Sequence, residues 1–186
     1  MPGNPSRKFT VMDAMVLVAA VAIGLAAERA YQASIESARS ASAGAITFPF
    51  RIRWFVRPAP LLASLTLALF ALRLHRPRPR YRRLVGSPGF AACYAAAMGL
   101  AFATLTFING FVTGYLGYNR QEVYLHYLTL QSITFAAPAV AAVWIALALL
   151  GRWRRHPARD WIEVSGIVIG FGWLVLLAAT QLIFYS

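Results

Sequence analysis

The sequence has little charge and almost no cysteine. Only 13% of its 186 residues are charged, whereas soluble domains average about a quarter. A single cysteine, Cys93, excludes a framework of intramolecular disulfides. Hydrophobic residues make up 59% of the chain, and a domain of this length leaves much of its surface in contact with water. These proportions exclude an ordinary soluble enzyme, a disordered tail and a small disulfide-built secreted module.

Four long apolar runs and a short one, over residues 58–72, dominate the chain. A helix needs about 20 apolar residues to cross the hydrocarbon layer of a membrane. Lipid cannot satisfy exposed backbone groups, and the runs lack the alternation of barrel strands, so we interpret them as helices. The sequence therefore predicts an all-α integral membrane helical bundle, with about five transmembrane helices in a single domain over residues 1–186. The expected helices cover approximately residues 10–27, 58–72, 88–117, 128–150 and 161–184.

Basic residues lie between these runs and predict the orientation of the helices. The chain has 18 basic and 6 acidic residues, and the basic ones should gather on the cytoplasmic side. A cytoplasmic N-terminus makes residues 73–87 a basic inner loop and residues 28–57 an outer loop. We therefore expect the N-terminus in the cytoplasm, the C-terminus on the opposite side of the membrane, and no nucleic-acid partner. A cleaved secretory signal at the N-terminus is the alternative, which Asp13 inside the apolar run disfavours.

Polar residues within the apolar runs are the candidates for function. Two acidic residues, Asp13 and Glu163, lie near the starts of their helices and predict either a site for a proton or cation, or carboxylates stabilised by the helix dipole. Uncharged polar residues recur in the last three runs, where they indicate either a polar pocket or hydrogen bonds between helices. The main ones are Thr106, Asn109, Thr113, Gln131 and Gln181, accompanied by Thr134 and Thr180.

Glycine pairs and clustered arginines indicate contact surfaces. Gly110 with Gly114, and Gly166 with Gly170, form GxxxG patterns that let helices approach closely, within this chain or against another protein. Arginines in the inner loop are expected to contact anionic lipid headgroups or an acidic partner. They are Arg73, Arg76, Arg78, Arg80, Arg82 and Arg83.

The N-terminal run resembles the opening of a known group of proteins. Residues 7–24 read RKFTVMDAMVLVAAVAIG. This resembles uncharacterised small multi-pass bacterial membrane proteins, which begin with a basic residue, Phe-Thr, an Asp three residues after the Thr, and a Leu-Val-Ala-Ala run. The resemblance covers about a tenth of the chain. It implies a bacterial membrane setting, so with the orientation above we expect a bacterial inner-membrane protein with a periplasmic C-terminus. It implies no functional residue.

No pattern in the sequence indicates catalysis. His75, His126 and His156 are expected in loops, no pair of histidines predicts a haem or metal site, and no cofactor motif is present. Our leading hypothesis is a non-catalytic accessory or packing subunit that binds partner helices, or further copies of itself, and lipid. A small transporter or channel using the polar residues of the last three helices is the first alternative. A membrane enzyme acting on lipid is the second.

Overall fold

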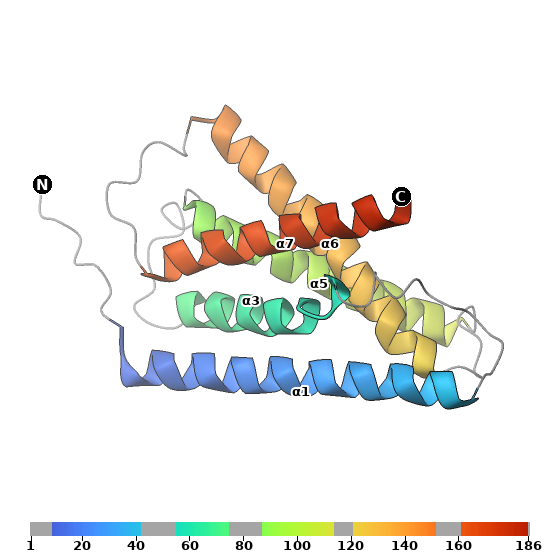
Figure 1. Ribbon diagram of the computed structural model, residues 1–186. Helices are drawn as coiled ribbons and strands as arrows, with labels where there is room; N and C mark the ends of the chain where they lie inside the picture. Colours follow the sequence, from blue (N-terminus) through green and yellow to red (C-terminus); the bar gives the residue numbers. More distant parts are fainter. Residues whose placement is uncertain (1–8, 42–54, 75–86, 114–120, 152–160, 186) are drawn as a thin grey trace, which may run out of the picture.

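The computed structural model describes residues 9–41, 55–74, 87–113, 121–151 and 161–185. These residues form five helices and, within the same ranges, no strand, which confirms the predicted all-α bundle (Figure 1). The helices are α1 (Val11–Ala41), α3 (Ala59–Leu74), α5 (Pro88–Val112), α6 (Gln121–Leu149) and α7 (Trp161–Tyr185).

Four of these helices are long and apolar enough to cross a membrane. The candidate spans are Val11–Ser34, Pro88–Val112, Leu125–Leu149 and Trp161–Ile183. Helix α3 is apolar too, but its 16 residues reach only about 24 Å at 1.5 Å per residue. The fold is therefore that of a multi-pass membrane protein with one short helix.

The helix bounds differ most from the sequence prediction where a helix continues past its apolar part. Helix α1 runs to Ala41, so the first part of the expected outer loop over 28–57 is helical. Helix α6 likewise begins at Gln121, before the expected 128. Outside lipid a helix keeps its own backbone hydrogen bonds, so hydropathy does not mark its end. Helix α5 ends earlier than expected, at Val112, where the Thr113 N–H donates to the Asn109 carbonyl oxygen.

The five helices run alternately in opposite directions (Figure 1). Helices α1, α5 and α7 start on the left of the figure, whereas α3 and α6 end there. We call this side the Trp161 end and the other side, where α6 starts, the Gln121 end. Such alternation is what consecutive membrane crossings joined by loops require.

Helix α5 is the centre of the bundle and α1 lies at its edge. The face of α5 that packs against α3, α6 and α7 consists largely of small residues, including Ala92, Ala95 and Ala96. Only 17% of the most apolar part of α1 is buried, against 44% for α5. Helix α1 contacts mainly α3, which it approaches where Gly24 lies against Leu61 and Ser64. Most of the apolar surface of α1 is therefore left to lipid or to another protein.

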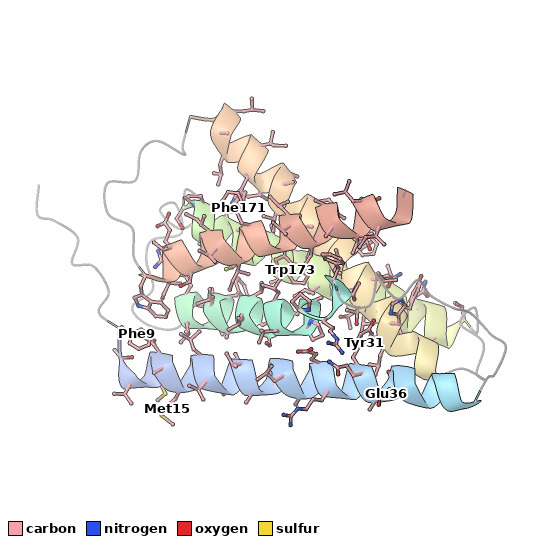
Figure 2. All side chains as sticks on the ribbon, in the orientation of Figure 1. Phe9, Met15, Tyr31, Glu36, Phe171 and Trp173 are labelled. Carbon is pink, nitrogen blue, oxygen red and sulfur yellow. The ribbon has the colours of Figure 1, made fainter. Side chains whose placement is uncertain are left out.

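Two tryptophans place hydrogen bonds inside the core. The Trp173 Nε1–H of α7 donates to the Thr66 hydroxyl of α3 at 3.0 Å, and both side chains are fully buried. Figure 2 shows Trp173 between these two helices. The Trp144 Nε1–H donates to the Pro88 carbonyl oxygen at 3.0 Å and so joins α6 to the start of α5. A buried indole N–H needs such a partner, so these bonds restrict how the helices can pack.

Candidate functional site

Asp13 forms a reciprocal cap at the start of α1. The Thr10 N–H donates to Asp13 Oδ2 at 3.0 Å, and the Asp13 N–H donates to the Thr10 hydroxyl oxygen at 3.2 Å. This arrangement satisfies two backbone donors that a helix start leaves without a partner, and the helix dipole stabilises the carboxylate. Phe9, which comes directly before Thr10, packs edge-to-face on Trp161, the first residue of α7, with ring centroids 4.9 Å apart. Asp13 itself is buried, one helical turn after this contact with the first residue of α7.

Glu163 lies in the first turn of α7, at the same end of the bundle. Its side chain is buried, and its backbone carbonyl lies directly against Gly89 at the start of α5. Ser87 caps that start, with its hydroxyl accepting from the Phe90 N–H at 3.4 Å. Both acidic candidates therefore lie at the Trp161 end, each near the N-terminus of its helix, where a negative charge is favoured.

The polar candidates nearer the Gln121 end include one pair joined across two helices. The Thr106 hydroxyl of α5 lies 3.0 Å from Gln131 Oε1 of α6, within hydrogen-bond distance. The Gln131 Nε2–H in turn donates to the Tyr127 hydroxyl at 2.8 Å. This short chain of polar groups connects α5 to α6.

The other polar candidates point elsewhere. Asn109 is exposed on α5, Thr113 is exposed directly after its last residue, and Gln181 is exposed on α7. The hydroxyls of Thr134 and Thr180 donate to carbonyl oxygens of their own helices. The structure therefore brings Thr106 and Gln131 together, and places Asn109, Thr113 and Gln181 on the outside of the bundle.

The second glycine pair lies at contacts between helices of this chain. A Cβ atom on Gly166 would lie 2.5 Å from the Gly89 carbonyl oxygen, and one on Gly170 would lie 2.6 Å from the Trp144 ring. These two glycines therefore let α7 approach α5 and α6. Gly110 is half-buried near the end of α5, and Gly114 lies outside the described residues.

Of the inner-loop arginines, the structure describes one. Arg73 occupies the last turn of α3, at the Trp161 end, and is half-buried. The others lie outside the described residues: Arg76, Arg78, Arg80, Arg82 and Arg83.

The structure also shows a buried pair that the sequence prediction missed. The expectation of a loop around His126 is wrong, because α6 already includes this residue. Tyr31 OH and His126 Nδ1 are 2.5 Å apart, both side chains are buried, and the bond joins α1 to α6. Figure 2 shows Tyr31 on the side of α1 that faces the other helices. The helical repeat could have indicated that His126 is buried, because it lies seven residues, or two helical turns, before the buried Ile133 and so shares its face of α6.

Within the described ranges, no three histidine, cysteine or acidic side chains are grouped so that they could hold a metal ion. Comparisons with family models, with curated proteins and with solved structures give no match to this chain. Composition and fold together define the class: a multi-pass helical membrane protein.

Proposed function

We propose that the protein is a non-catalytic accessory subunit of a membrane assembly, which binds partner helices and anionic lipid. We place it in a bacterial inner membrane, with a cytoplasmic N-terminus and a periplasmic C-terminus. The surface of α5 around Asn109 is the observation that carries this proposal.

Asn109 lies among exposed apolar side chains near the end of α5. Its neighbours Leu105, Ile108 and Val112 are all exposed, and together these four residues form what we call the Asn109 surface. Among the residues that the structure describes, none forms a hydrogen bond with the Asn109 side chain. An amide on a membrane helix readily bonds to a neighbouring helix, for about 0.6 kcal/mol on average. The Asn109 surface therefore suits contact with a helix of another protein or of a second copy.

The buried polar groups support a packing role in another way. Within the described helices, hydrogen bonds between side chains join α1 to α6 through Tyr31 and His126, and α3 to α7 through Thr66 and Trp173. Another joins α5 to α6 through Thr106 and Gln131. Each bond uses polar groups to hold the bundle in one arrangement. Because these polar groups bind one another between helices, they support a role in packing more than a role in lining a path for a transported molecule.

The lipid part of the proposal rests on charge. Arg73 lies in the last turn of α3, and the sequence continues from it into five further arginines before residue 84. Each basic residue near an anionic leaflet contributes about 1 kcal/mol of attraction. This attraction would hold the Trp161 end at the cytoplasmic surface, which is also the orientation that the distribution of basic residues predicts.

Photo-crosslinking in cells tests the partner surface. A photoreactive amino acid is introduced in place of Leu105, which is 63% exposed. In the control, the same amino acid takes the place of Val175 on α7, which is 64% exposed. We expect a discrete crosslinked product from position 105 that weakens when Asn109→Leu is added, and none from position 175. A product of twice 20.4 kDa identifies a second copy, and any other mass identifies a different subunit. Equal patterns from both positions would contradict the proposal.

A further inference from the structure

Three aromatic rings from two helices form a cluster at the surface of the bundle. Phe70 of α3 packs near Phe90 and Tyr94 of α5, with ring centroids 6.1 Å and 5.9 Å away, and the two α5 rings are 6.3 Å apart. Phe70 and Phe90 are half-buried, while Tyr94 is 49% exposed. We call these three residues the aromatic platform. They close the outer side of the contact between α3 and α5.

A positive charge lies next to this platform. Arg73 follows Phe70 by three residues, which puts both on one flank of α3. In the same turns Leu69 and Leu72 face the core and are buried, whereas Leu74 is exposed. Arg73 is itself half-buried, with its Nε atom buried, and lies in the last turn of α3, at the Trp161 end of the platform.

The short length of α3 brings the membrane surface to Arg73. Its 16 residues reach about 24 Å, less than the hydrocarbon layer of about 30 Å. A helix shorter than the layer is accommodated when the bilayer thins locally or when a flanking charged side chain extends to the headgroups. At this end of α3, either response would place lipid phosphate beside Arg73, one helical turn from Phe70 of the aromatic platform.

We propose that an anionic phospholipid binds at this place, with its phosphate at Arg73 and its glycerol and upper acyl chain on the aromatic platform. The acyl chain continues over the exposed side chains of Met98 and Phe102, one and two turns further along α5. Tyr94 favours this depth of the membrane because its ring is apolar and its hydroxyl can bind water or a headgroup, while Phe70 and Phe90 add apolar surface beside it. This inference rests on the lipid part of the proposed function and gives it a location.

Native mass spectrometry of the purified full chain, titrated with phosphatidylglycerol or phosphatidylcholine, tests the site. We expect tighter binding of phosphatidylglycerol, weakened about fivefold by Arg73→Gln through loss of one basic residue at the headgroup. Tyr94→Leu should weaken it about threefold through loss of ring contacts. Two matched controls should leave it unchanged: Arg29→Gln on exposed α1, and Phe171→Leu on α7, where the ring is 54% exposed.

Three results would overturn the inference. If Arg73→Gln and Arg29→Gln weaken binding equally, only net charge matters, and the location fails while a preference for anionic lipid remains. If phosphatidylcholine binds as tightly as phosphatidylglycerol, the lipid part of the proposed function fails as well. If millimolar glycerol phosphate displaces the lipid, the site binds a soluble phosphate group. None of these results changes what crosslinking at position 105 reports, so the partner surface is tested separately.

Discussion

Replacing Gly166 with alanine tests the closest contact in the bundle. Here α7 crosses α5 with Gly166 facing Gly89, so backbone meets backbone. A Cβ atom on Gly166 would lie 2.5 Å from the Gly89 carbonyl oxygen and 2.8 Å from its carbonyl carbon. Ordinary contact begins near 3.4 Å, so the helices would have to separate by about 0.9 Å. A backbone carbonyl within a helix cannot rotate away as a side chain could.

The size of the effect follows from the cost of overpacking. Forcing one methyl group into a well-packed core typically costs about 1–3 kcal/mol, and alanine returns up to about 1 kcal/mol as the better helix former. We expect Gly166→Ala to lower the free energy of unfolding by about 1–2 kcal/mol. The matched control is Gly172→Ala on the same helix, where the new Cβ meets only the flexible end of Leu62, at 3.1 Å and 3.3 Å. The free energy of unfolding of that variant should equal that of the wild type or be slightly higher.

The assay is reversible unfolding of the purified protein in mixed micelles, with increasing sodium dodecyl sulfate and intrinsic tryptophan fluorescence as the signal. Both alanine variants and the wild type are measured under identical conditions. Equal free energies of unfolding for Gly166→Ala and Gly172→Ala would refute the reasoning, because they would show that α5 and α7 do not approach as closely at Gly89 as the structure describes.

Three further predictions use the same assay. Trp173→Phe and Thr66→Val should show a coupling free energy of about 0.6–1.7 kcal/mol in a double-mutant cycle, since each removes the same buried hydrogen bond; additive effects would contradict this. Tyr31→Phe should lower the free energy of unfolding by about 1 kcal/mol in the wild type, and by much less in a His126→Phe background, where the bond is already absent. An equal effect in both backgrounds would show that the bond contributes nothing. Thr10→Ala removes the cap of α1 and should cost about 0.5–2 kcal/mol, whereas Thr10→Ser should cost little; equal losses would argue against the cap.

The positions of the helices could be predicted because hydropathy reports burial in lipid. Helices α3 and α7 begin and end within two residues of the expected 58–72 and 161–184. The ends of α1 and α6 could not be predicted in this way, because both helices continue through polar residues. For example, Gln32 of α1 donates to Glu28 within the same helix, at 2.9 Å. Such contacts stabilise a helix without any apolar signal.

The contacts between individual residues were harder to predict from the sequence than the positions of the helices. Tyr31 and His126 are 95 residues apart, and Thr66 and Trp173 are 107 apart, so no local pattern connects them. The GxxxG pattern of Gly166 and Gly170 indicated a close approach but left the neighbouring helix open. The sequence shows which residues are small or polar, whereas the crossing of the helices decides which of them meet.

The central claim is that the protein acts as a subunit through the Asn109 surface. The most direct measurement is native mass spectrometry of the tagged protein purified in mild detergent, comparing the wild type with Asn109→Leu. Our account predicts a stoichiometric assembly heavier than one 20.4 kDa chain, which dissociates at a lower collision energy in the variant. Recovery of the wild type as a single chain that carries only lipid would contradict the account.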